Sequence, residues 1–196
     1  MRKTSMPVVR ARPNPVDFWL PLLHRGVTVR ATVNVGVMNF LIHEAGIDPK
    51  YIAKRIGSVF LDGCPVDDLE RAMITEGCHL ALGMAAPGLA GTSLNRGSPL
   101  AGFRADISYH PGQGHEQPAP GTFTLKLFNL VALEAAVSIL RLGFVVTGKE
   151  LTKAWARGPQ KFLACVDRVE LEGKAIAPAQ AAEIFKSDDL IRVVLA

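Results

Sequence analysis

The clearest pattern along the chain is a strict alternation of apolar and polar residues from Val27 to Asn34. A period of two puts one kind of side chain on each face of an extended segment, so this stretch predicts a half-buried strand. From Val35 to Ala45 the apolar residues recur at helical spacing, and Gly46 can end that helix in the left-handed conformation. Asp48 then suits the N-cap of a second helix, with Pro49 at its first position.

A short apolar run interrupted by Asp-Gly follows, in the segment Val59–Val66. The pair Asp62-Gly63 tolerates the positive φ angles of a two-residue turn, so the segment predicts a β-hairpin. The next polar pair, Asp67-Asp68, can cap a short helix through Met73. The apolar residues Leu80–Leu82 predict a strand that closes the unit.

The same signals recur in the same order 110 positions later (59 to 169), where Val169–Ile176 repeats the hairpin pattern. The shift aligns Pro49 with Pro159 and also brings Gly63 onto Gly173. These two identities are informative because Pro restricts φ and Gly permits positive φ. We therefore predict an internal duplication, with chance matching in an apolar chain as the alternative.

The 110-residue alignment of the two copies is inconsistent at one place. Ala132–Leu142 aligns with the alternating strand of the first copy, but its Leu, Glu and Ala content favours a helix. Either the two copies have diverged there or the alignment does not extend that far. The last apolar run, Leu190–Leu195, predicts the closing strand of the second copy.

A segment unlike either copy lies between them. Gly83–Gly102 is rich in Gly, Ala, Ser and Pro, and Phe103–Tyr109 then alternates as a strand would. A polar loop at His110–Pro120 leads to a second alternating stretch, Thr122–Phe128. These two strands would form a connecting β-hairpin, and a loop of this length is often functional or mobile.

The chain is thus expected to be an α+β protein made of two tandem related units. We expect a flexible basic arm at residues 1–15, a first repeat at 16–90, a Gly/Pro-rich connector with a strand at 91–121, and a second repeat at 122–196. The arm carries Arg2, Lys3, Arg10 and Arg12 and has no apolar signal core after it.

The succession of strand, helix, Asp-Gly hairpin, short helix and closing strand resembles the β-grasp (ubiquitin-like) fold, in particular the sulfur carriers of thiamine and molybdopterin synthesis. The segments that carry the resemblance are Gly46–Pro49, Val59–Gly63, Glu76-Gly77 and Leu80–Leu82. In that family a terminal Gly-Gly carboxylate is activated. Here the closing strand continues into Pro87–Gly91 in mid-chain, so the resemblance implies the fold and not the carrier chemistry.

Composition narrows the class of protein. Of the 196 residues 48% are hydrophobic and 20% are charged, which favours a packed core over disorder, and the net charge of +4 permits an anionic partner without requiring one. Three widely spaced cysteines favour a reducing compartment, so we expect a cytoplasmic protein. The longest apolar stretch, 130–146, contains Glu134 and Arg141, which argues against a membrane span.

Two segments are candidates for binding. The two predicted helices before and after Gly46, followed by a small hairpin, are similar to the αL RNA-binding motif of ribosomal and pseudouridine-synthase proteins. This resemblance implies RNA contacts from the second helix, at Lys50, Lys54 and Arg55. The glycine-rich segment could instead present backbone N–H groups and a guanidinium to a small anion, or simply pack as a loop. Its candidate ligand- or partner-binding residues are Gly88, Leu89, Gly91, Thr92, Ser93, Asn95 and Arg96.

Catalytic and metal signatures are missing from the sequence. His110, His115 and Glu116 lack the paired spacing of a zinc site, and no cofactor motif is present. Cys64 has no base placed beside it by the sequence, so we expect no catalytic residues and no metal. The leading hypothesis is a non-catalytic protein-binding or scaffold module that associates with another protein or with itself. The alternatives are an RNA-binding module or a small-anion binder or enzyme at the glycine-rich segment.

Overall fold

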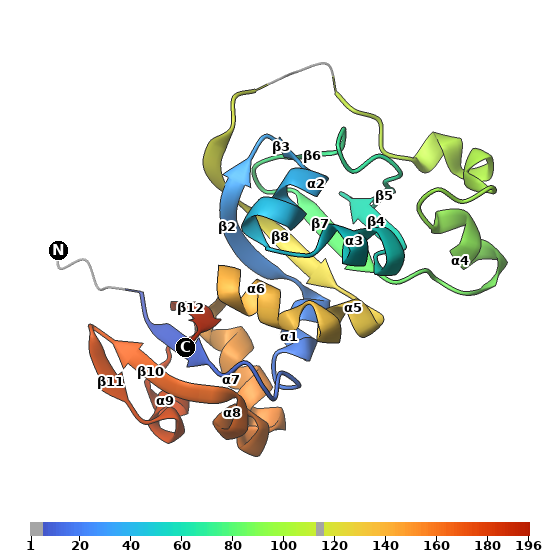
Figure 1. Cartoon of the computed structure of the whole chain (residues 1–196). Coiled ribbons are helices and arrows are strands. Elements are labelled where there is room, and N and C mark those ends of the chain that lie inside the picture. Colours follow the sequence, from blue (N-terminus) through green and yellow to red (C-terminus); the bar gives the residue numbers. More distant parts are fainter. Residues whose placement is uncertain (1–5, 113–115) are drawn as a thin grey trace.

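One mixed sheet of ten strands runs through the computed structural model, which describes residues 6–112 and 116–196 (Figure 1). The strands lie in the order β11-β10-β1-β12-β9-β2-β8-β7-β4-β5. In chain order they are β1 (Val8–Ala11), β2 (Val27–Val33), β4 (Ser58–Leu61), β5 (Cys64–Pro65), β7 (His79–Gly83), β8 (Ala119–Leu127), β9 (Phe144–Thr147), β10 (Val166–Leu171), β11 (Lys174–Ile176) and β12 (Leu190–Leu195). Two short strands, β3 (Val35–Gly36) and β6 (Met73–Ile74), pair separately.

Short helices connect these strands. Those of the first part of the chain are α1 (Leu20–Arg25), α2 (Val37–Asn39), the π-helical η1 (Phe40–Glu44), α3 (Pro49–Arg55), α4 (Gly88–Leu94) and the 3-10 helix η2 (Ala101–Ile107). Those of the second part are α5 (Asn129–Glu134), α6 (Ala136–Leu142), α7 (Gly148–Arg157), α8 (Pro159–Cys165) and α9 (Pro178–Ile184). Within the described residues, none of these helices combines the length and the apolar character needed to cross a membrane.

The two faces of the sheet differ in what covers them. Alternate residues of each strand form one continuous buried row across the sheet, and its members include Val9, Val193, Phe144, Val29, Phe123, Leu80 and Val59. The residues between them form the opposite face, which we call the open face: Val8, Arg10, Arg192, Val145, Thr28, Arg30, Thr124, Lys126, His79, Ala81 and Phe60. All of these except Val145 are exposed or half-buried. Ser58 shares this face but is buried, because its hydroxyl bonds Asn95 at the end of α4.

The two Asp-Gly-type turns are confirmed. Asp62 and Gly63 have φ angles of 50° and 83°, and Glu172 and Gly173 have φ angles of 49° and 79°. Each pair forms the complete two-residue loop between two antiparallel strands, β4 and β5 in the first half and β10 and β11 in the second. A side chain is strained at such angles, which is why glycine follows the acidic residue in both turns.

The two hairpins differ in the strand that pairs with them. In the first half β4 pairs with the closing strand β7, and β7 then runs parallel to β8. In the second half β10 pairs with β1, and β1 runs parallel to the closing strand β12. The α+β class is confirmed, and the description as two tandem β-grasp-like units remains a prediction.

Three local expectations are corrected. The stretch expected to be a flexible arm supplies strand β1, which is held between β10 and β12; residues 1–5 lie outside the described residues. The strand expected at 103–109 is the 3-10 helix η2, so there is no connecting β-hairpin, and β8 pairs with β2 and β7 instead. Asp68 accepts hydrogen bonds from Glu70 N and Arg71 N as a cap would, but the chain there forms a turn into β6.

Other expectations are confirmed. Asp48 caps α3 by accepting hydrogen bonds from Lys50 N and Tyr51 N at 2.7 and 3.2 Å. The stretch at 132–142, which aligns with strand β2 but has a helical composition, belongs to helices α5 and α6. The second half therefore has helices at the positions that the 110-residue shift aligns with strand β2.

Candidate functional site

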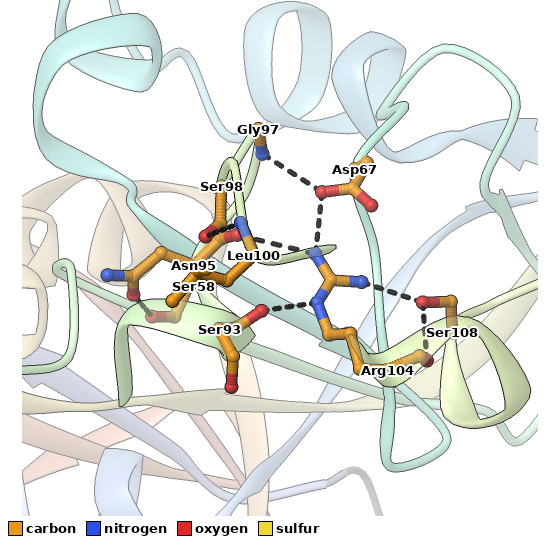
Figure 2. Close-up of polar contacts among 9 residues, drawn as sticks. All are labelled: Ser58, Asp67, Ser93, Asn95, Gly97, Ser98, Leu100, Arg104 and Ser108. Carbon is orange, nitrogen blue, oxygen red and sulfur yellow. Dashed lines mark hydrogen bonds and ion pairs between the residues drawn. The ribbon is translucent and has the colours of Figure 1, made fainter. Parts of the chain in front are cut away.

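In the structure the segment between the halves carries helices α4 and η2, and from here on we call its residues 88–112 the connector. One buried arginine anchors it (Figure 2). Arg104 on η2 is only 4% exposed, and all three nitrogens of its guanidinium donate hydrogen bonds. The acceptors are Asp67 Oδ1 at 2.7 Å, the Ser93 carbonyl at 2.6 Å and Ser108 Oγ at 2.7 Å. A buried charge must be paired and hydrogen-bonded, and this set satisfies both needs.

Asp67 links the connector to the hairpin of the first half. Its Oδ1 accepts from Arg104 and also from the backbone N–H of Gly97 at 2.9 Å. Burial alone would raise the pKa of Asp67, but the hydrogen bonds from Arg104 and Gly97 and the nearby positive charges outweigh burial, and the net pKa lies below its usual value. The carboxylate therefore stays ionised at neutral pH.

The prediction of a strand at 103–109 is wrong because the apolar residues of this stretch are exposed and its arginine is buried. Alternation would have buried Phe103 and Ile107 and exposed Arg104. In the structure Arg104 is buried, whereas Phe103 is 88% and Ile107 is 56% exposed. Sequence reasoning missed Arg104 as the anchor because its acceptor Asp67 is 37 positions away.

Two of the candidate ligand-binding side chains are already engaged inside the protein. The side-chain amide of Asn95 accepts from Ala86 N at 2.7 Å and from Ser58 Oγ at 2.9 Å. The guanidinium of Arg96 donates to the Ile52 carbonyl at 3.1 Å, and burial lowers the pKa of Arg96. These contacts fix the connector against β4 and α3 and leave less of either group for an anion.

The remaining candidates lie on α4. Gly88 begins this helix with a φ of 79°, and a Cβ on Gly91 would lie 2.8 Å from the Ala86 carbonyl atoms. Gly88 is therefore explained by its backbone conformation and Gly91 by the close approach of Ala86. Thr92 and Ser93 follow on the same helix, and the Ser93 carbonyl bonds Arg104. Leu89 is 81% exposed, so it is the member of this set most available to a partner.

The basic helix α3 is partly used for packing. Arg55 and Tyr51 both donate to the carboxylate of Glu134 on α5; the Tyr51 Oη to Glu134 Oε2 distance is 2.8 Å. Burial, together with the Glu134 carboxylate, raises the pKa of Tyr51, and the hydrogen bonds from Arg55 and Tyr51 lower the pKa of Glu134. Lys50 and Lys54 are exposed, so two of the three residues in the RNA prediction are accessible.

The thiols and carboxylates do not assemble a reactive centre in the described part of the chain. Cys78 and Cys165 are buried, and burial raises the pKa of both thiols, which keeps them protonated. Cys64 is half-buried beside the first turn. No group of three or more His, Cys, Asp or Glu side chains suited to a metal is found among residues 6–112 and 116–196; His115 lies outside the described residues.

Comparison with protein-family models, with curated proteins and with solved structures found no match to this chain. Inferences about its function therefore depend on its own residues. The most distinctive feature of these residues is the connector, which is hydrogen-bonded to the first half and exposes large apolar side chains.

Proposed function

We propose that this protein is a non-catalytic binding module whose connector docks onto an apolar surface of another protein. The observation that carries the proposal is the exposure of three large apolar side chains on the connector. Leu89, Phe103 and Ile107 are 81%, 88% and 56% exposed. Exposed apolar side chains that gather in one patch mark contact sites for other proteins, and α4 and η2, which carry these three residues, contact each other.

The anchoring of the connector supports this role. A mobile loop could fold its apolar side chains inward, but the Arg104 and Asn95 hydrogen bonds hold α4 and η2 in place. A segment held in its binding conformation loses less entropy when a partner docks. Full burial of a side chain such as Leu or Phe contributes about 1.5–3 kcal/mol, so burial of the three offsets part of the entropy lost on association.

Site-specific photo-cross-linking tests the proposal. p-Benzoylphenylalanine in place of Phe103 should give a discrete cross-linked product with another protein chain, to be identified by mass spectrometry. The same group at Leu190, which is 50% exposed at the start of β12, is the matched control and should give little product. The Leu89→Ser and Ile107→Ser changes should each reduce the Phe103 product severalfold.

The identity of the cross-linked product shows whether the partner is a second copy of this chain or a different protein. A product of twice the chain mass, with a mass in solution that rises with concentration, would mean that the partner is a second copy. A product with a different chain would mean a heterologous partner. Equal cross-linking from positions 103 and 190, or none from either, would overturn the proposal.

A further inference from the structure

The open face of the sheet has a hollow where β12, β9 and β2 lie side by side. Its volume is about 200 Å³, and its lining residues are Arg30, Leu142, Gly143, Phe144, Val145 and Arg192. A cavity needs only about 10–15 Å³ to hold one water molecule, so this hollow has room for a small ligand group. It lies on a different part of the fold from the connector.

Strand register explains why the hollow is there. Arg192 lies opposite Val145, and Val145 lies opposite Thr28. Extending the antiparallel β2–β9 register by two residues brings Arg30 opposite Gly143. Because Gly143 has no side chain, the position between the two arginines is open. A Cβ there would come within 3.4 Å of Arg192 Nε.

The charges in the hollow are unbalanced. On the same open face, Arg10 and Arg168 both donate to the carboxylate of Glu170. Arg30 and Arg192 have neither a hydrogen bond nor an ion pair from their guanidinium groups to any described residue, and no carboxylate lines the hollow. Both arginines are exposed, so solvent screens their charges, but an anion in the hollow would be attracted by two guanidinium groups at once.

We infer that this hollow binds a phosphate group through the guanidinium groups of Arg30 and Arg192. Each guanidinium has a planar fork of N–H donors that matches the oxygens of a tetrahedral oxyanion, and two forks can engage four oxygen positions. The open position at Gly143 admits the anion between them. The group can belong to inorganic phosphate or to a phosphorylated small molecule.

A second hollow of the same protein provides the comparison. Arg25, Arg157 and Lys161 are among the residues that line a cavity of about 160 Å³ between α1 and the α7–α8 pair. That cavity contains its own counter-ion, since Asp17 Oδ2 lies 3.2 Å from Lys161 Nζ. Arg157 is therefore a matched control: an arginine beside a cavity of similar size in which an internal carboxylate is present.

Isothermal titration with inorganic phosphate, at an ionic strength kept constant with sodium chloride, tests the inference. The wild-type protein should bind phosphate saturably, and Arg30→Ala and Arg192→Ala should each weaken binding by at least about tenfold. Arg157→Ala should change affinity by less than about twofold. A titration with a phosphorylated sugar then separates the two sources of the group, since tighter binding than that of phosphate would mean a phosphorylated ligand.

Folding does not confound the result, because neither arginine bonds another described residue and both alanine variants should melt like the wild type. Arg30→Lys keeps the charge but loses the fork, and it should bind with intermediate affinity. Absence of saturable phosphate binding by the wild type would overturn the inference. So would affinity that survives both alanine changes, or that falls only with Arg157→Ala.

Discussion

The two hairpins of this molecule are alike in their turns and different in their neighbours. Gly63 and Gly173 have φ angles of 83° and 79°, and each follows an acidic residue near 50°. Yet β4 pairs with the strand that closes its own half, whereas β10 pairs with β1 from the other end of the chain. A turn depends on two residues, but a strand neighbour depends on competition among all strands of the chain. The repeated sequence pattern therefore determines the hairpins and does not determine the sheet around them.

The largest expected effect comes from breaking the long-range neighbour of the second hairpin. Val9 is fully buried in β1, so Val9→Asp places an unpaired carboxylate in the core and should cost at least about 3 kcal/mol of unfolding free energy. Hydrogen exchange should show β10 and β12 losing protection before β4 and β7. Leu80→Asp in β7 should reverse that order.

The control for this pair lies on the open face. Val8→Asp, one residue before Val9 and half-buried, should cost less than about 1 kcal/mol because the carboxylate reaches water. If Val9→Asp lowered the hydrogen-exchange protection of both halves equally at every denaturant concentration, the two halves would unfold as a single cooperative unit. The difference between the hairpin neighbours would then have no effect on local stability.

The next effect concerns the connector, which is hydrogen-bonded to the first half. Arg104→Ala removes the buried guanidinium that donates to Asp67 and to the Ser93 carbonyl, and it should cost about 2–3 kcal/mol, less than the loss of a fully buried pair because Asp67 is partly exposed. Limited proteolysis should then cut within 88–112. Arg168→Ala removes the ion pairs of an exposed guanidinium with Asp167 and Glu170, and it should leave the unfolding midpoint nearly unchanged. Equal costs for the two changes would contradict the anchoring role.

The parts of the fold that were predictable are those decided by neighbouring residues. The turns at Gly63 and Gly173 and the cap at Asp48 each need one or two residues in a special conformation, and the sequence displays them. The connector was not predictable in this way. Its helix η2 buries a charge and exposes apolar side chains, which reverses the rule that alternation depends on, and Arg104 finds its acceptor 37 positions away. The pairing of β1 with β10 spans still more of the chain; the Arg10–Glu170 contact joins residues 160 positions apart.

A smaller effect tests whether the two turns are energetically equal. Gly63→Ala and Gly173→Ala each place a Cβ at a positive φ with open space around it, so strain comes from the backbone alone. Each change should cost about 1–2 kcal/mol, and the two costs should agree within about 0.5 kcal/mol. Chemical denaturation of both variants measures this. A difference larger than about 1 kcal/mol would show that the surrounding sheet, and not the turn, sets the cost.

Smaller still is the difference between the acidic residues of the turns. Asp62 Oδ1 accepts from His79 N at 2.8 Å and so joins the first turn to its closing strand, whereas the Glu172 side chain makes no such bond within the described residues. Asp62→Ala should cost about 1 kcal/mol and Glu172→Ala less than about 0.5 kcal/mol. Matching costs would mean that the Asp62 bond adds nothing to the first hairpin.

The smallest expected effect is an acid response confined to the connector. Because hydrogen bonds from Arg104 and Gly97 outweigh burial, the pKa of Asp67 is lower in the folded protein than the value of about 3.9 expected when unfolded. Its stabilising contribution is therefore complete above about pH 4 and is lost as the pH falls through the lower, folded pKa. Pepsin cleavage within 88–112, normalised to an unstructured peptide, should accelerate on acidification below that pH in the wild type and stay level in Asp67→Asn. Parallel curves for the two proteins would show that the connector is held by its other contacts, and that the asymmetry between the halves does not depend on this charge.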